Sequence, residues 1–165
     1  MLFTGEYEHT IDAKLRVAVP SEIRAVLDPD VHGEGFYAAP GLNGALWIWP
    51  TRKFEEYVNA MDASLLPEDD VMAFDDFFFS QAARLEIDSA GRVRLPERLL
   101  RGAGIDKTVT ILGVRDHLEL RDPAQWATLL EEKRRSQADL MTKARQAMAR
   151  QHGRNTGGST AATGA

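Results

Sequence analysis

Apolar and polar residues alternate in four short stretches of the chain, and this pattern predicts β-strands. Residues 16–19 read Arg-Val-Ala-Val and residues 92–95 read Arg-Val-Arg-Leu, so each stretch has an apolar face and a face that carries arginine. The stretches before them, residues 7–11 and 85–87, alternate in the same way. A period of two residues is typical of a strand with one buried face. Each arginine-bearing strand is therefore expected to follow another strand after a corner.

The corner belongs to a sequence motif that occurs twice. Residues 12–20 read DAKLRVAVP and residues 88–96 read DSAGRVRLP, and Asp88 follows Asp12 by 76 residues. An Asp at the start of a turn can accept hydrogen bonds from backbone N–H groups two residues on. The closing proline lacks a backbone N–H, so it ends the strand and can begin a helix. We therefore predict an internal duplication, each copy built as strand, corner, strand and short helix.

The remaining patterns predict an α+β protein with five segments. They are a first repeat at 1–53, an acidic helical bridge at 54–80, a second repeat at 81–122, a C-terminal helix at 123–152 and a disordered tail at 153–165. The bridge is predicted from apolar residues at helical spacing, with Thr51 as the N-cap of its first helix. The tail is too polar, and its side chains are too small, to pack into a core.

The composition excludes several kinds of chemistry. The 165 residues include no cysteine, so disulfides, thiolate metal sites and cysteine nucleophiles are excluded. The absence of cysteine is compatible with a location in the reducing cytoplasm. No apolar run approaches the roughly 20 residues of a membrane helix, so no membrane partner is expected. The four histidines are scattered without metal-ligand spacing, and no phosphate-binding loop occurs. We therefore expect no metal, cofactor or small-molecule substrate, and no enzymatic activity.

Charge is distributed unevenly along the chain. The net charge is −5, but residues 1–80 hold five Lys or Arg against fifteen Asp or Glu, whereas residues 81–165 hold fifteen against ten. Residues 54–83 contain no Lys or Arg at all. Because binding of a charged partner depends on the local electrostatic potential, the negative net charge does not exclude a nucleic-acid partner. We expect an acidic flank and a narrow basic face at the two arginine corners.

The doubled Asp-x-x-x-Arg motif, with the sequence GEYEHTID before its first copy, resembles the MraZ family within the SpoVT/AbrB class over residues 1 to about 130. The resemblance implies two AbrB-like swapped-hairpin β repeats that form an internal pseudo-dimer, with linking helices and a long C-terminal helix. It also implies a transcriptional regulator of the division and cell-wall gene cluster. Such a regulator would be a cytoplasmic, nucleoid-associated ring of identical subunits that binds short direct repeats of double-stranded DNA in its own promoter.

Both corners depart from the family's usual Asp-x-Lys-Gly-Arg. The first copy keeps Lys14 and has Leu15 at the glycine place, whereas the second copy keeps Gly91 and has Ala90 at the lysine place. If the corner requires a positive φ at the glycine place, Leu15 is strained there or the turn is rebuilt.

Four basic residues are the candidate DNA contacts. They are Lys14, Arg16, Arg92 and Arg94. Arginine can donate two hydrogen bonds to guanine in the major groove, whereas lysine more often acts as a point charge on phosphate. An alternative is that Asp12 and Asp88 pair with the arginines and only fix the corners. Both interpretations can hold together if the aspartates orient the arginines. Arg94 can supply the charge that Ala90 lacks, or it can be a solvated strand residue.

Two further features have alternative interpretations. The aromatic residues between 47 and 79 could stack on bases, but their spacing and acidic surroundings favour a core and a subunit interface. The basic C-terminal helix is either a solvated face or a secondary nucleic-acid contact. A rival function from another class is a protein-interaction or antitoxin-like oligomeric module that does not bind DNA, in which the acidic segment 54–83 is the working surface.

Overall fold

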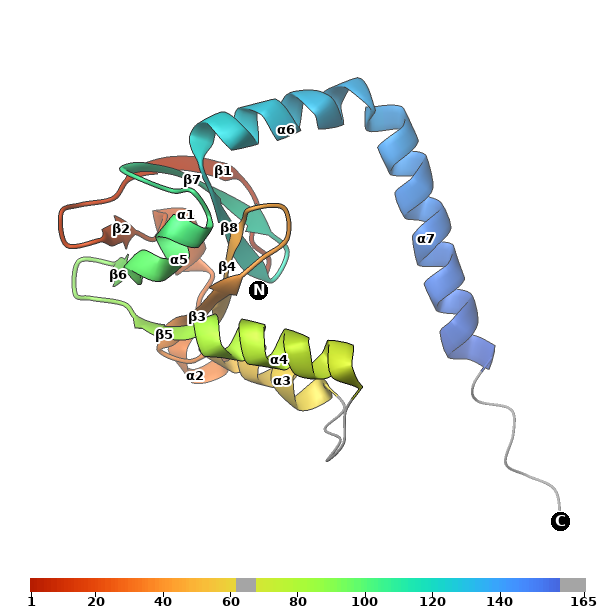
Figure 1. Cartoon of the computed structure of the whole chain (residues 1–165), viewed down its shortest axis with the longest axis horizontal. Coiled ribbons are helices and arrows are strands. Elements are labelled where there is room, and N and C mark those ends of the chain that lie inside the picture. The colour runs from red at the N-terminus through yellow and green to blue at the C-terminus, as the bar shows by residue number, and fades with distance from the viewer. Residues whose placement is uncertain (62–67, 158–165) are drawn as a thin grey trace, which may run out of the picture. The chain divides into compact units, whose positions relative to one another are not determined.

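A computed structural model of the chain describes residues 1–61 and 68–157, and side chains up to residue 151. The chain divides into two compact units, Met1–Trp126 and Ala127–Ala165. The first unit holds both sequence repeats and the helices between them (Figure 1). Within the described residues no helix is long and apolar enough to cross a membrane.

The two repeats form the same succession of elements. The first repeat contains β1 Glu6–Thr10, β2 Arg16–Ala18, α1 Ser21–Ala25, α2 Pro29–His32, β3 Gly35–Pro40 and β4 Leu46–Pro50. The second repeat contains β5 Ala83–Glu86, β6 Arg92–Arg94, α5 Glu97–Gly102, β7 Thr108–Val114 and β8 His117–Arg121. The helices α3 Thr51–Ala60 and α4 Asp69–Gln81 join them. Pro20 and Pro96 are the N-caps of α1 and α5, as expected for residues that end a strand and begin a helix.

The first strand of each repeat pairs with a hairpin of the other repeat. The main sheet has the order β1-β7-β8-β4-β3-β5, and a separate two-stranded ribbon consists of β2 and β6. All pairs are antiparallel. Thus β1 of the first repeat lies on β7 of the second, and β5 of the second lies on β3 of the first. This exchange within one chain confirms the predicted α+β fold of two repeats.

The registers show that an approximate twofold axis relates the repeats. The ribbon is centred on the pair Val17–Val93, and the pairing of β4 with β8 is centred on Trp47–Glu119. Equivalent strands pair at equivalent residues: His9 faces Val109 as Leu85 faces Phe36. The chain therefore forms an internal pseudo-dimer.

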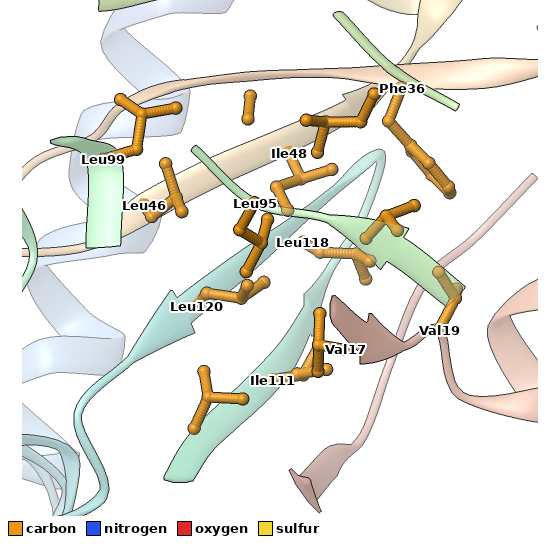
Figure 2. Close-up of a cluster of buried hydrophobic side chains, with 14 of the residues drawn as sticks. Val17, Val19, Phe36, Leu46, Ile48, Leu95, Leu99, Ile111, Leu118 and Leu120 are labelled. Atoms are coloured by element: carbon orange, nitrogen blue, oxygen red, sulfur yellow. The ribbon is translucent and has the colours of Figure 1, made fainter. Parts of the chain in front are cut away.

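The apolar face of the ribbon packs over the main sheet. Val17, Val19, Val93 and Leu95 are 0–4% exposed and belong to one core cluster with the sheet residues Ile48, Ile111, Leu118 and Leu120. Figure 2 shows side chains from both repeats interleaved in this core. Full burial of an aliphatic side chain contributes about 1.5–3 kcal/mol, so the alternating pattern fixes which ribbon face turns outward.

Three sequence expectations need correction at helix boundaries. Thr51 is the first residue of α3 and is buried, and Pro50 is the N-cap. The C-terminal helix predicted at 123–152 is divided at Ser136 into α6 Pro123–Arg135 and α7 Gln137–Gly157. The Ser136 hydroxyl donates to the carbonyl of Glu132 at 3.0 Å, a contact that bends helices. Because α7 runs to Gly157, the predicted tail at 153–165 is helical at its start, and residues 158–165 lie outside the described part.

Candidate nucleic-acid interface

A carboxylate folds the first corner, between β1 and β2. Asp12 Oδ1 accepts hydrogen bonds from the backbone N–H groups of Lys14 and Arg16, both at 2.9 Å. Asp12 Oδ2 accepts from Arg16 Nε at 2.8 Å and lies 2.7 Å from Arg16 Nη2. The same aspartate therefore closes the turn and orients the arginine that follows it.

The second corner, between β5 and β6, repeats this geometry. Asp88 Oδ1 accepts from the N–H groups of Ala90 at 2.9 Å and Arg92 at 3.0 Å. Asp88 Oδ2 accepts from Arg92 Nε at 3.0 Å and lies 2.9 Å from Nη2. In each corner the aspartate uses two of the arginine's nitrogens, and Nη1 has no partner among the described residues. Each arginine is thus paired with its aspartate and keeps its Nη1 group available for another hydrogen-bond acceptor.

The hydrogen bonds lower the pKa of both aspartates. For Asp12 the main cause is the bond from the backbone of Arg16, followed by its guanidinium, against an opposing effect of burial. For Asp88 the guanidinium of Arg92 is the largest cause, followed by the backbone bond from the same residue. Both carboxylates therefore stay ionised at neutral pH and hold their arginines in place.

Leu15 occupies the glycine place of the first corner without a rebuilt turn. Its φ is +60°, and the φ of Gly91 in the second corner is +75°. Leu15 N donates to Asp12 O at 2.9 Å, as Gly91 N donates to Asp88 O at 2.9 Å. A left-handed conformation costs an L-residue with a Cβ about 1–2 kcal/mol. Leu15 is half-buried against the core, and this contact offsets part of the strain.

Each corner is also attached to the opposite repeat. The carbonyl of Leu15 accepts from Leu95 N at 2.8 Å, and the carbonyl of Gly91 accepts from Val19 N at 2.9 Å. Because β2 and β6 are antiparallel, these bonds hold the corners at opposite ends of the ribbon. The corners therefore lie on one rigid element rather than on independent loops.

The ribbon brings the three candidate arginines to one face. Arg16 pairs in register with Arg94, and Arg92 pairs with Ala18, while the central valines point into the core. Arg94 is exposed and forms no ion pair with any described residue. Lys14 is exposed at the first corner. The Arg16–Arg94 pair places two positive charges directly opposite each other on the outward face of the ribbon.

Sequence reasoning missed a fifth basic residue at this interface, Arg24 on α1. A Cβ on Gly91 would lie 2.8 Å from the Arg24 guanidinium carbon, and Arg24 Nε donates to Val19 O at 3.2 Å. Arg24 is exposed and corresponds in the duplication to Leu100, which is buried. The second corner, which lacks a lysine at Ala90, thus receives a positive charge from the first repeat. The alignment of the two copies hides this contact because it crosses between them.

The bridge aromatics divide into a core part and an exposed part. Trp49, Phe54 and Phe78 form a buried cluster with Ala39, whereas Phe74 and Phe77 on α4 are 45% and 60% exposed. Among the described residues, no group of three or more His, Cys, Asp or Glu is arranged to hold a metal ion.

The two repeats exchange strands, and the β2–β6 ribbon carries arginines on its outward face. These features define a tandem swapped-hairpin protein with one basic face. The family described as "MraZ protein, putative antitoxin-like" matches residues 2–75 and again residues 78–151, once for each repeat. The chain therefore belongs to the MraZ family.

Curated relatives carry the same family name. A transcriptional regulator MraZ from Acetivibrio thermocellus is 36% identical over 125 residues, which cover 76% of this chain and 84% of the relative. Those from Heliobacterium modesticaldum and Desulfitobacterium hafniense are 34% and 36% identical over 126 residues, covering 76% of this chain and 85% of each relative. The chain is accordingly a transcriptional regulator of this family and not an enzyme.

Proposed function

We propose that this regulator binds double-stranded DNA in a sequence-specific manner through the outer face of the β2–β6 ribbon. The DNA contacts are Lys14, Arg16, Arg92 and Arg94, with Arg24 added at the second corner. Asp12 and Asp88 orient the corner arginines. The observation that carries this proposal is the register of the ribbon, which places Arg16 opposite Arg94 with Arg92 two pairs away on the same face.

A two-stranded ribbon has the right dimensions for the major groove of B-DNA. Arginine donates to O6 and N7 of guanine, and each such bidentate contact discriminates by about 1–3 kcal/mol. Since the Asp contacts fix Arg16 and Arg92 before DNA arrives, the side chains give up less entropy on binding. The pseudo-twofold axis places the two corners symmetrically about the centre of the ribbon.

The target in this proposal is a set of short direct repeats in the promoter of the protein's own division and cell-wall gene cluster. One ribbon with a few basic residues on a chain of net charge −5 binds weakly by itself. Several ribbons tethered in a ring of identical subunits raise avidity by about 10² to 10⁴ over one site. Correct spacing of the repeats is then required, and the protein is expected at the nucleoid.

Fluorescence anisotropy of a labelled duplex from upstream of the gene tests the proposal. The titration uses wild type, Arg16→Ala and the control Arg52→Ala, at several salt concentrations. Arg52 lies on α3, outside the ribbon. Removing a side chain that neutralises one phosphate flattens the slope of log affinity against log salt by about 0.9. We expect weaker binding for Arg16→Ala, wild-type binding for Arg52→Ala, and much weaker binding of wild type to a duplex in which the repeats are scrambled. Equal binding by wild type and Arg16→Ala contradicts the proposal.

A second candidate function, a protein-interaction or antitoxin-like module, is favoured by one observation. The acidic residues 69, 70, 75 and 76 of α4 form no ion pair within the described structure, and apolar side chains between them are exposed. A cationic protein partner whose binding survives Arg16→Ala and disappears when these acids are neutralised supports this alternative.

A further inference from the structure

A large apolar groove lies on the first unit, on the side formed by α3, α4 and the β4–β8 pair. Its volume is about 650 Å³, and its lining includes Trp47, Trp49, Tyr57, Phe74, Phe77 and His117. Phe77, at 60% exposure, lines a second, smaller pocket as well. Met61 and Leu42 at its margin are 43% and 67% exposed. An exposed aromatic surface of this size marks an interaction site.

The helix α4, which contributes Phe74 and Phe77 to the groove lining, is acidic. On α4, Asp69, Asp70, Asp75 and Asp76 form no ion pair with any described residue. Arg115 and Asp116 also line the groove. The Tyr57 hydroxyl donates a hydrogen bond to the Asp116 carboxylate. Residues 54–83 contribute no Lys or Arg. The groove therefore favours an apolar occupant whose flanks are positively charged.

The helix α7 in the second unit has these properties. Leu140 and Met141 are 46% and 65% exposed, and Ala144 continues the same helix face. Lys143 and Arg145 flank this apolar stripe, since residues three to five positions apart lie on adjoining faces of a helix. Between residues 133 and 154 the sequence holds seven Lys or Arg and a single acid, Asp139. The unbranched Met141 side chain can adapt to an aromatic surface.

We propose that the aromatic groove of one copy binds α7 of a second copy. The apolar stripe lies against Phe74, Phe77 and Tyr57, and the basic flanks face the α4 aspartates. This is helix-in-groove recognition, in which apolar residues supply affinity and the charges set orientation. The described side chains of α7 span residues 137–151, about 22 Å at 1.5 Å per residue.

The proposal defines the kind of oligomer. Groove and helix are different surfaces, so the contact is heterologous, and such contacts close into rings or continue as filaments. It rests on the ring-shaped assembly of the proposed function and names the surfaces that would form it. DNA binding by a single ribbon does not depend on it.

Sedimentation velocity of the full chain tests the two surfaces. Phe77→Asp changes the groove and Met141→Asp changes the helix. The controls are Val31→Asp, on the exposed surface of α2, and Gln146→Asp, on the opposite face of α7. We expect both test variants to sediment as monomers and both controls to sediment as the wild-type oligomer. Circular dichroism confirms folding, and the pair Lys143→Glu/Arg145→Glu repeats the helix test with exposed residues only.

Mixing the two defective variants gives the decisive result. Phe77→Asp keeps an intact helix and Met141→Asp keeps an intact groove, so an equimolar mixture is expected to form a 1:1 heterodimer that grows no further. A mixture that stays monomeric, or a Met141→Asp variant that keeps the wild-type assembly, overturns the proposal.

The anisotropy titration separates this outcome from failure of the proposed function. If the helix does not form the contact, Arg16-dependent DNA binding persists unchanged. If wild type itself is a monomer, both the ring and this contact are wrong, and the ribbon proposal is tested on its own.

Discussion

The two corners of the molecule reach the same backbone geometry with different residues. The first has Lys14 and a leucine at positive φ, and the second has Ala90 and a glycine. The aspartate bonds at the two corners agree to within 0.2 Å. The Asp-x-x-x-Arg frame therefore determines the turn, and the residue at the glycine place only changes its energy. The positive charge that Ala90 cannot provide comes from Arg24 of the other repeat.

The largest effect should come from removing the arginine of either corner. Arg16→Ala and Arg92→Ala are each expected to weaken promoter binding by about 5- to 150-fold, the value of a bidentate guanine contact of 1–3 kcal/mol. Equivalent geometry predicts comparable effects at the two corners. Anisotropy at fixed salt measures both, with Arg52→Ala as the matched control. Weaker binding for Arg16→Ala alone would show that the second corner does not contact DNA.

The next largest effect is expected on stability, at the glycine place of the second corner. Gly91→Ala is expected to lower the free energy of unfolding by about 1–2 kcal/mol, since alanine at positive φ is strained and its Cβ displaces Arg24. Gly102→Ala is the control, because a Cβ there meets nothing within 4 Å. Urea denaturation measures both. Unchanged stability of Gly91→Ala would mean that the corner accepts side chains freely and that Leu15 is unstrained.

A smaller effect is expected for Arg24→Ala. If Arg24 supplies the missing charge at the second corner, its removal flattens the salt dependence of DNA binding by up to about 0.9, the equivalent of one phosphate. The variant should retain wild-type stability, because Arg24 is exposed. Introducing Ala90→Lys into it is expected to restore the slope. An unchanged slope in Arg24→Ala would show that Arg24 does not contact the DNA.

The smallest effect concerns acid stability. The pKa of Asp12 and of Asp88 is lowered in the folded chain from an ordinary value of 3.8. A lowered pKa stabilises the fold above the ordinary value, and this contribution disappears as the pH falls through the folded value. The urea midpoint of wild type should therefore fall more steeply below pH 4 than that of Asp12→Asn/Asp88→Asn. Parallel curves would show that the ion pairs do not contribute.

Much of the fold follows from local patterns. Period-two alternation predicts β2 and β6, and the matching motifs predict the duplication, because both depend on residues close in sequence. Two of the features that escaped prediction depend on distant or subtle interactions. Arg24 approaches Gly91 only through the exchanged fold, and the break at Ser136 depends on one hydroxyl–carbonyl bond within an otherwise helical sequence. The DNA contacts of Lys14, Arg16, Arg92 and Arg94 stay predictions.

The exchanged strands also govern how the protein emerges from the ribosome. Tyr7 on β1 pairs with Ile111 on β7, so 104 residues must be made after Tyr7 before the two residues can pair. At a synthesis rate of about 5–20 residues per second, β1 waits about 5–20 seconds as an unpaired strand. β3 likewise stays an open edge until β5 arrives. A nascent chain of this design is therefore exposed to strand pairing with its neighbours on a polysome, and a message cut after the first repeat would yield no folded half.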